Sequence, residues 1–239
     1  MKLFQTDIIE ELLSFERETL SKKVEEPILL TSEIKETVLI LGYSQNLTGL
    51  NLNEVKKEKL KVYRRCSGGS AVLSKKVFIT SLFLPNNEQF YFSIANGYNL
   101  FVKVFKNGLN QLVDGVEESL LKEKVDSPIC FLSQSGETLL YKGKKFFGGA
   151  QVRNKNCILI HFSLLQDLDY FLHQKIFGID AKILKEKIVS LNVDTEKLRE
   201  KIYKSFSQEL NSSISFPPEK PQIKDEFMKE TQTSKLKPI

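Results

Sequence analysis

The sequence predicts an α/β fold of the α+β kind, because helical and strand patterns follow one another along the chain in blocks. The blocks run in the order helix, strands, helix, strands, helices. The chain has 239 residues, of which 41% are hydrophobic and 27% charged, values typical of a globular protein with a sizeable core. We therefore expect one substantial domain over 1–212, followed by a flexible tail over 213–239.

The first half of the chain predicts one helix and then a group of strands. Apolar residues recur at helical spacing over 5–24, where Thr6 or Asp7 is available as the N-cap. Short apolar runs rich in β-branched residues and bounded by charged or turn residues follow, and they predict strands at 27–30, 37–43, 61–73 and 75–85. A Gly-Gly turn interrupts the third of these runs.

The second half predicts a helix, further strands and two closing helices. The helical pattern returns over 90–112, and strand patterns follow at 127–131, 137–149 and 157–165. The last helices are expected at 181–190 and 195–210, the second of them capped by Asp194. The segment after them is rich in Pro, Ser and charge, which is typical of a flexible tail.

Charge and cysteine content exclude several classes of protein. The net charge is +5, from 35 Lys and Arg against 30 Asp and Glu, and it is spread along the chain, which favours acidic protein partners or anionic cofactors over nucleic acid. We find no apolar run long enough for a membrane span. Three cysteines without CxxC spacing argue against a disulfide framework and against a metal site. We therefore expect a cytoplasmic protein.

The stretch RRCSGGSAV carries the first candidate site. Its successive small residues offer backbone N–H groups to an anion or oxyanion, and two guanidiniums beside them suit carboxylate or phosphate. The candidate residues are Arg64, Arg65, Ser67, Gly68 and Gly69. Taken alone, the stretch is also compatible with an ordinary hairpin turn.

The stretch GKKFFGGAQVR carries the second candidate site, with Lys145 ahead of three small residues, Gly148, Gly149 and Ala150. Together with the first stretch it resembles the paired motifs of the lipoate-protein ligase A and octanoyltransferase family, which is related to the biotin-protein ligases. The resemblance extends from LILGYSQN through CILIHFSLL to the last helix and covers about 5–210. It implies a mixed, largely antiparallel sheet flanked by helices, and a catalytic domain over 1–212.

Cys130 lies in SPICFLSQSGETLLYKGKKFFGGAQVR, which resembles the motif SPxCFxxPSxxELxxxGRKxxGSAQxR of the cysteine-type octanoyltransferases. The resemblance implies that Cys130 is the nucleophile. A nearby ammonium would favour its reactive thiolate, and Lys145 is the matching lysine. The alternative for a free cysteine is a small buried hydrophobe, which we expect for Cys157 and prefer for Cys66.

The resemblance also assigns binding roles and reveals departures. The first-loop residues would hold the acyl carbonyl or an adenylate, Ala71 would leave room for an aliphatic tail, and His161 either frames the pocket or is a core histidine. The chain departs from the family after Leu73, where the usual His-Asp pair is Ser74-Lys75. The usual Gly-Ser of the second loop is Gly148-Gly149.

Three functions remain open on this basis. The preferred one is transfer of an octanoyl or lipoyl group from an acyl carrier protein to the acceptor lysine of a lipoyl domain. The transfer runs through a Cys130 thioester and needs no cofactor. The acceptor is a lipoyl domain of a 2-oxoacid dehydrogenase complex or the glycine-cleavage H protein. The second is an ATP-dependent lipoate-protein ligase that uses Mg and lipoate. The third is a non-catalytic protein that binds lipoyl domains or acyl groups.

Overall fold

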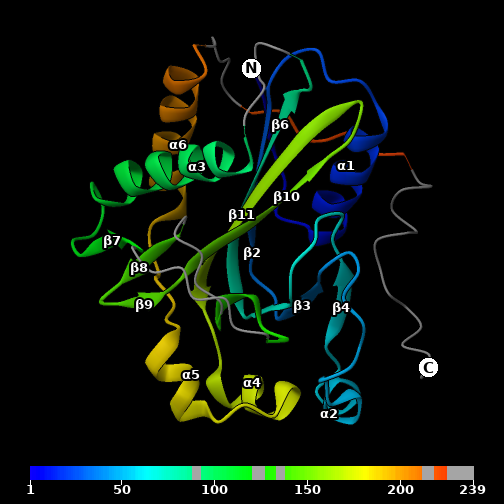
Figure 1. Ribbon diagram of the computed structural model, residues 1–239, viewed down its shortest axis with the longest axis vertical. Coiled ribbons are helices and arrows are strands. Elements are labelled where there is room, and N and C mark those ends of the chain that lie inside the picture. The colour runs from blue at the N-terminus through cyan, green and yellow to red at the C-terminus, as the bar shows by residue number, and fades with distance from the viewer. Residues whose placement is uncertain (88–92, 120–126, 133–137, 212–217, 225–239) are drawn as a thin grey trace.

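The computed structural model describes residues 1–87, 93–119, 127–132, 138–211 and 218–224 (Figure 1). The described part is built around one five-stranded sheet, with helices on both faces and two smaller three-stranded sheets beside it. Within the described residues, no helix is both long enough and apolar enough to cross a membrane.

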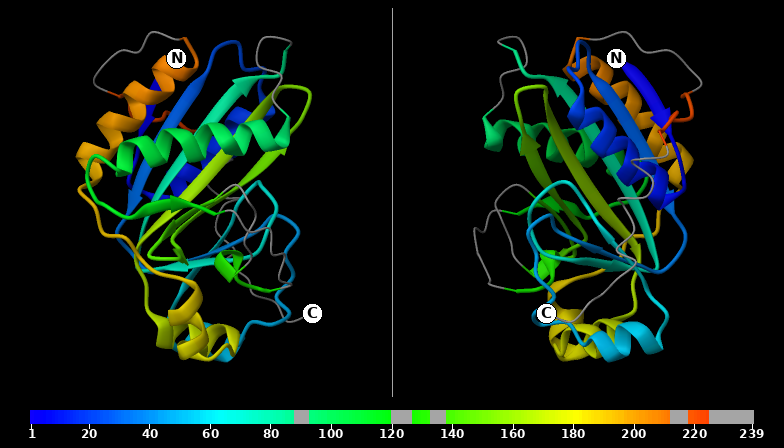
Figure 2. Two further views of the ribbon diagram at one scale, coloured as in Figure 1. Left: turned by 60° about the vertical axis from the view of Figure 1, so that its left-hand side comes forward. Right: turned by 90° about the vertical axis from the view of Figure 1, so that its right-hand side faces the viewer.

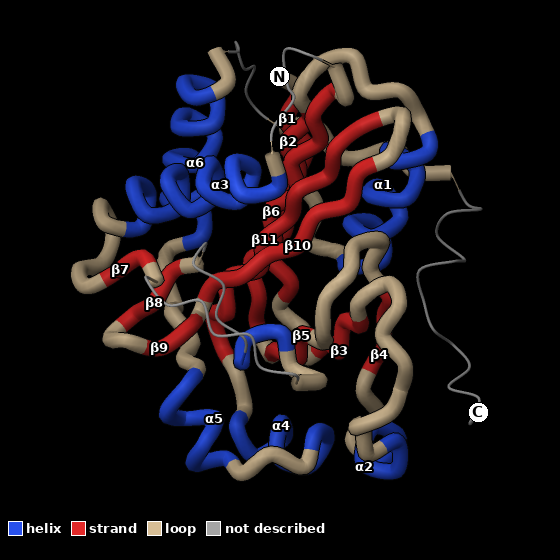
Figure 3. The backbone as a smooth tube through the Cα atoms, viewed as in Figure 1, coloured by secondary structure: helices blue, strands red, loops and turns tan. Residues whose placement is uncertain are grey.

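The main sheet is mixed and largely antiparallel, so the predicted fold class is confirmed. Its strands are β1 (Lys2–Gln5), β2 (Ile28–Ile34), β6 (Lys76–Pro85), β10 (Phe147–Arg153) and β11 (Cys157–Asp167). They are ordered β1-β2-β6-β11-β10, side by side in Figure 3. The edge strand β1 runs parallel to β2, and the other three neighbouring pairs are antiparallel.

In the described part of the chain, three helices cover the main sheet, and its side chains pack into two cores, one on each face. The helices are α1 (Ile9–Ser21) on one face, and α3 (Ile94–Leu109) and α6 (Thr195–Glu209) on the other. Because successive strand residues point to opposite faces, Ile79 of β6 packs in the core under α1, and its neighbour Phe78 packs in the core under α3 and α6.

Phenylalanine rings fill the core under α3 and α6. Phe162 of β11 stacks on Phe147 at a centroid distance of 4.6 Å and on Phe101 of α3 at 4.8 Å. Phe105 lies 4.6 Å from Phe147, and Phe206 of α6 meets Phe101 edge-on at 4.9 Å. Such ring pairs stabilise a core by about 0.5–1.5 kcal/mol each beyond the area that they bury.

The smaller elements gather at one end of the molecule and along one side of the main sheet (Figure 2). One small sheet has the order β4-β3-β5, with β3 at Val38–Leu41, β4 at Lys61–Arg64 and β5 at Val72–Ser74. The other has the order β7-β8-β9, with β7 at Val116–Glu118, β8 at Leu139–Tyr141 and β9 at Lys144–Lys145. The remaining helices are α2 (Leu52–Lys57), α4 (Tyr170–Phe177), α5 (Ala181–Lys187) and the 3₁₀ turn η2 (Cys130–Leu132).

Several boundaries differ from the sequence-based expectations. The first helix begins at Ile9 because Lys2–Gln5 pairs with β2 as a strand, and neither predicted N-cap residue caps it: Thr6 donates to Glu11 instead. The strand expected at 127–131 is wrong, since Cys130 begins a 3₁₀ turn. Asp194 caps α6 as predicted, by accepting from the Lys197 N–H. Residues 90–92 of the helix expected over 90–112 lie outside the described residues.

The division into a domain over 1–212 and a tail over 213–239 stays a prediction. Of the tail, the structure describes 218–224, and this segment lies against β1 and α1. Glu219 exchanges backbone hydrogen bonds with Leu3 and Gln5, of 2.9 and 2.8 Å, and the Lys224 N–H donates to a Glu18 carboxylate oxygen at 3.0 Å.

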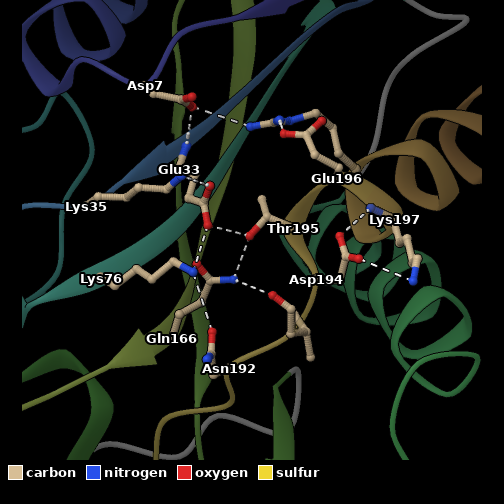
Figure 4. Close-up of polar contacts among 12 residues, drawn as sticks. Asp7, Glu33, Lys35, Lys76, Gln166, Asn192, Asp194, Thr195, Glu196 and Lys197 are labelled. Carbon is tan, nitrogen blue, oxygen red and sulfur yellow. Dashed lines mark hydrogen bonds and ion pairs between the residues drawn. The ribbon is translucent and has the colours of Figure 1, made fainter.

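A polar cluster joins the start of α6 to the sheet (Figure 4). The Glu33 carboxylate accepts from Thr195 Oγ1 at 2.6 Å and lies 2.8 Å from Lys76 Nζ and 3.0 Å from Lys35 Nζ. Gln166 of β11 donates to the same Thr195 hydroxyl at 2.9 Å. Burial opposes ionisation of Glu33, but the hydrogen bonds from Lys76, Thr195 and Lys35 outweigh it and lower its pKa to about 2.

We predict that Glu33→Gln lowers the free energy of unfolding at pH 7 by about 2 kcal/mol, after allowance for solvent screening of the lysines. Because the folded-state pKa lies below the ordinary value of 4.5, this stability is present above pH 4.5 and is lost as the pH falls toward 2. Urea unfolding at several pH values measures the gap between the two proteins. Glu200→Gln, in an exposed pair with Lys204, is the control and should change little. A gap that stays constant down to pH 2 would contradict the assignment.

Candidate active site

The loop between β4 and β5 is held in place by its own arginine and by Gly42. The Arg65 side chain donates to the carbonyl oxygens of Gly68 and Ser70, at 2.7 and 3.0 Å. Gly69 has φ +89°, which favours glycine, and a Cβ on Gly42 would lie 1.8 Å from the Gly69 carbonyl oxygen. The close approach of these two backbones therefore requires glycine at position 42, a residue that the sequence analysis did not single out.

Both predicted anion-binding arginines contact backbone carbonyl groups. The Arg64 guanidinium donates to the carbonyl oxygens of Gly42, Tyr43 and Gln45, at 2.7–3.0 Å. Arg65 is buried, whereas Gly68 and Gly69 are exposed. Apart from Gly68 and its two chain neighbours, no atom of the described residues lies within 4 Å of the position that a Cβ on Gly68 would take. The open surface of this loop is thus its glycine backbone.

A buried hydrogen-bonded chain supports the loop from below. His161 of β11 contacts Ser67 Oγ through Nε2 at 2.9 Å and Glu16 Oε1 through Nδ1 at 3.1 Å. Since a carboxylate accepts, Nδ1 donates to Glu16, and the other ring nitrogen, Nε2, is the one that contacts the Ser67 hydroxyl. Ser81 of β6 also donates to Glu16, at 2.5 Å. His161 therefore positions the Ser67 loop instead of packing as an isolated core residue.

Glu16 is a residue that the sequence analysis missed. Ile9, Leu12, Leu13 and Leu20 form the apolar stripe of α1, and Glu16 occupies the same stripe and is fully buried. A carboxylate at a helical position otherwise occupied by aliphatic residues was the available signal, because a charge is rarely buried without a partner.

The Cys130 segment is bound to the first loop through its backbone. The Cys130 N–H donates to the Ala71 carbonyl at 3.0 Å, and the Ala71 N–H donates to the Pro128 carbonyl at 2.9 Å. Ser70 Oγ donates to the Ser127 carbonyl at 2.7 Å, and Gln45 Nε2 donates to the Pro128 carbonyl at 3.1 Å. These contacts place the half-buried Cys130 beside the glycine loop.

Lys145 reaches the same point from β9. Its side chain is 4% exposed, and its Nζ lies 3.4 Å from the Cys130 carbonyl oxygen and 5.6 Å from the centroid of the Phe131 ring. Burial lowers the pKa of Lys145, and the charge of a Cys130 thiolate acts in the opposite direction. Burial likewise lowers the pKa of Arg65, and the electrostatic interaction with Cys130 opposes this change more than that with any other group. The structure thus brings together Cys130, Lys145 and Arg65 within electrostatic reach.

The two glycines of the second loop lie in β10, each against a different site residue. A Cβ on Gly148 would lie 3.1 Å from Lys145 Cε, and a Cβ on Gly149 would lie 2.4 Å from the His161 carbonyl oxygen. Ala150 is buried and pairs with His161 across the β10–β11 ladder. The small residues of the second motif therefore form the part of β10 against which Lys145 and His161 pack.

Cys157 and the second histidine, His173, are buried at other points of the chain, whereas Cys66 lies in the glycine loop between Arg65 and Ser67. Cys157 is fully buried, and burial raises the pKa of its thiol to about 11. His173 is buried in α4, and burial lowers its pKa. Among the residues that the structure describes, we find no group of three or more His, Cys, Asp or Glu side chains arranged to hold a metal ion.

Comparison with known sequences identifies relatives of the chain. Residues 9–228 match the family model of the lipoyl protein ligase A/B catalytic domain. An octanoyltransferase LipM from Brevibacillus brevis is 31% identical over 161 residues, which cover 63% of this chain and 58% of the relative. A LipM from Geobacillus kaustophilus is 29% identical over 201 residues, 72% of this chain and 71% of the relative. The alignment with the Brevibacillus protein thus spans less than two thirds of that protein's length.

Comparison with solved structures supports the fold. A lipoate-protein ligase A bound with ATP superposes with a TM-score of 0.74 at 19% identity and covers 96% of this chain and 92% of that chain. A candidate lipoate protein ligase from T. acidophilum with bound lipoic acid gives a TM-score of 0.75 at 20% identity, with the same two coverages of 96% and 92%.

We predict opposite outcomes for the two neighbouring glycines. Gly149→Ala should lower the free energy of unfolding by about 2–3 kcal/mol, because its Cβ would overlap the backbone of β11. Gly148→Ala should cost less than about 1 kcal/mol, because the side chain of Lys145 can shift. Urea unfolding of both variants measures the difference. Equal losses would contradict this packing.

Proposed function

The chain belongs to the lipoyl protein ligase A/B catalytic domain family, and from this premise we propose that it is an octanoyltransferase that modifies the acceptor lysine of lipoyl domains. The observation that carries the proposal is the meeting of Cys130 with Lys145, whose Nζ lies 3.4 Å from the Cys130 carbonyl oxygen. The relatives named octanoyltransferase LipM support acyl transfer.

The proposed reaction runs in two steps through a thioester. The Cys130 thiolate attacks the carbonyl carbon of an octanoyl thioester, the C–S bond of the donor breaks, and the donor leaves as a thiolate that takes up a proton. The neutral amine of the acceptor lysine then attacks the Cys130 thioester, an amide forms, and Cys130 is released as thiolate while the amine loses its proton. Neither step consumes ATP or needs a metal ion.

The groups around Cys130 suit the charges of both steps. The ammonium of Lys145 favours the attacking thiolate and also the negative charge that develops on the carbonyl oxygen. The exposed backbone of Gly68 and Gly69 offers N–H groups to the same oxygen. The chain Glu16–His161–Ser67 keeps that backbone in place.

An ATP-dependent lipoate-protein ligase is the second candidate. The observation that favours it is the pair of buried cations Lys145 and Arg65, because buried positive charge also suits the carboxylate of lipoate and an adenylate phosphate. This function would require ATP, Mg and lipoate. A non-catalytic lipoyl-domain or acyl-binding protein is the third candidate, and the Ser74-Lys75 replacement of the family's His-Asp pair is the feature that favours it.

The proposed reaction defines the partners. The donor is an octanoylated acyl carrier protein, and the acceptor is the lipoyl domain of a 2-oxoacid dehydrogenase complex or the glycine-cleavage H protein. Both steps use water-soluble protein partners, and we propose that they take place in the cytoplasm.

The first test concerns the thioester. Incubation with octanoylated acyl carrier protein, without ATP, should add one octanoyl group that hydroxylamine removes, and intact mass with peptide mapping should locate it on Cys130. Cys130→Ser should show no such adduct and no transfer to an apo lipoyl domain. A Cys130→Ser protein that modifies the lipoyl domain with lipoate and MgATP would instead establish the ligase. A parent protein inactive with both donors would favour the non-catalytic alternative.

The second test compares two adjacent lysines. Lys145→Ala should slow octanoyl transfer to the lipoyl domain about a hundredfold or more, because it removes a preorganised charge from the reacting atoms. Lys144→Ala is the matched control: the Lys144 ammonium donates to the Lys185 carbonyl oxygen on the outside of the hairpin, so its loss should change the rate less than about threefold. If the two variants lose activity equally, the assignment of Lys145 is wrong.

A further inference from the structure

A basic face with exposed apolar side chains lies next to Cys130 and Lys145. We call it the α4–α5 face and define it by Phe171, Lys182, Ile183, Lys185 and Lys187. We propose that the α4–α5 face docks the acidic acyl carrier protein that delivers the octanoyl group. This inference rests on the proposed transfer reaction and adds the surface that recognises the donor.

The position of α5 connects this face to the reacting residues. The segment directly after α5 pairs with β9: Ile188 forms a parallel bridge with Lys145, and the Val189 N–H donates to the Lys145 carbonyl at 3.0 Å. The helix also packs on η2, which begins with Cys130. Lys187 therefore lies one residue from Ile188, the bridge partner of Lys145, and α5 lies at the lower end of the molecule in Figure 1.

The charges of the α4–α5 face are not neutralised by neighbours that the structure describes. None of its three lysines has a carboxylate oxygen of the described residues within 4.0 Å. Other exposed lysines of the described residues are paired, as Lys103 is with Glu209 and Lys106 with Glu118, whereas Lys23 and Lys155 have no carboxylate partner among them. The acids of α5 are Asp180, whose carboxylate caps the helix at Lys182 N, and Glu186. The face is thus positive in net charge and suits an acidic partner.

Two large apolar side chains lie exposed among these lysines. Phe171 is 66% exposed and Ile183 is 50% exposed. The Lys185 ammonium lies 5.4 Å from the centroid of the Phe171 ring and 5.7 Å from that of Tyr170. Aromatic and aliphatic anchors within a charged rim are typical of protein interfaces, so the face offers contact area as well as charge.

The lateral position of the α4–α5 face favours the donor over the acceptor. An acyl carrier presents its thioester at the end of a long phosphopantetheine arm, so its folded body binds away from the thiol that it acylates. A lipoyl domain presents a lysine side chain, which is much shorter, so that domain has to sit directly over the Cys130 thioester. A docking surface beside the thiol therefore fits the carrier.

The test uses two charge-reversal variants of the full chain. Lys182→Glu/Lys187→Glu changes the α4–α5 face, and Lys23→Glu/Lys155→Glu makes the same change in charge at the far end of the β10–β11 hairpin. Lys23 and Lys155 are both exposed. Lys155 lies in the turn between β10 and β11, next to the Arg153–Ile158 pair, and the Phe147–Leu164 pair lies at the other end of this ladder. At low salt, the Kd for octanoylated acyl carrier protein should rise about tenfold or more in the first variant and less than about twofold in the second.

Acylation by a small thioester, octanoyl-N-acetylcysteamine, separates this inference from the proposed function. In Lys182→Glu/Lys187→Glu, the rate of Cys130 acylation at limiting carrier should fall about tenfold, and the rate with the small thioester should fall far less. Equal weakening of carrier binding by both variants, unchanged carrier binding, or weakened binding of the apo lipoyl domain alone would overturn the docking inference. A parent protein that binds the carrier but is acylated by neither donor would overturn the transfer reaction while leaving the docking surface in place.

Discussion

The backbone pairing of Ala71 with the Cys130 segment is the constraint on which the site depends. Two hydrogen bonds, of 2.9 and 3.0 Å, fix Pro128 and Cys130 against the residue that ends the glycine loop. That loop is itself fixed, because Gly69 packs against Gly42 at a distance that admits no side chain at position 42. Because Ala71 is fully buried, these two bonds satisfy its backbone groups away from water, and they hold the backbone of the Cys130 segment beside the loop.

The alternation of side chains along the strands of the main sheet places the phenylalanine core and the residues that support the glycine loop on opposite faces. On β11, Phe162 faces the phenylalanine core under α3 and α6, and its neighbour His161 faces α1, where Glu16 meets it at 3.1 Å. The core under α3 and α6 contains most of the buried phenylalanine rings, and the core under α1 contains, besides its aliphatic residues, a polar chain that ends at Ser67. A buried carboxylate is costly unless it is hydrogen-bonded, so the bonds from His161 and Ser81 are what allow Glu16 to support the loop from inside the core.

Much of the fold could be predicted from the sequence, and the site could be predicted in part. The long periodic segments were found, and the paired motifs selected Cys130 and Lys145, which the structure brings together. The sequence analysis did not predict the strand β1 and the helix α2, because elements of four and six residues carry little periodicity. Glu16 and Gly42 were not predicted as site residues for another reason. Their roles depend on contacts with His161 and Gly69, which form only in the folded chain. The arginines of the first motif were expected to bind substrate, and their observed contacts with loop carbonyls follow from tertiary packing that no local pattern encodes.

The central claim is that Lys145 makes Cys130 the reactive thiol of this chain, and the rates of alkylation of its three cysteines test it most directly. Cys66 and Cys130 are both half-buried and Cys157 is buried, so exposure alone predicts similar rates for the first two. Iodoacetamide labelling at neutral pH, followed by peptide mass spectrometry, should modify Cys130 about tenfold faster than Cys66, and Lys145→Met should remove most of that difference while leaving the Cys66 rate unchanged. Equal rates at Cys66 and Cys130 in the parent, or a Cys130 rate unaffected by Lys145→Met, would contradict the account.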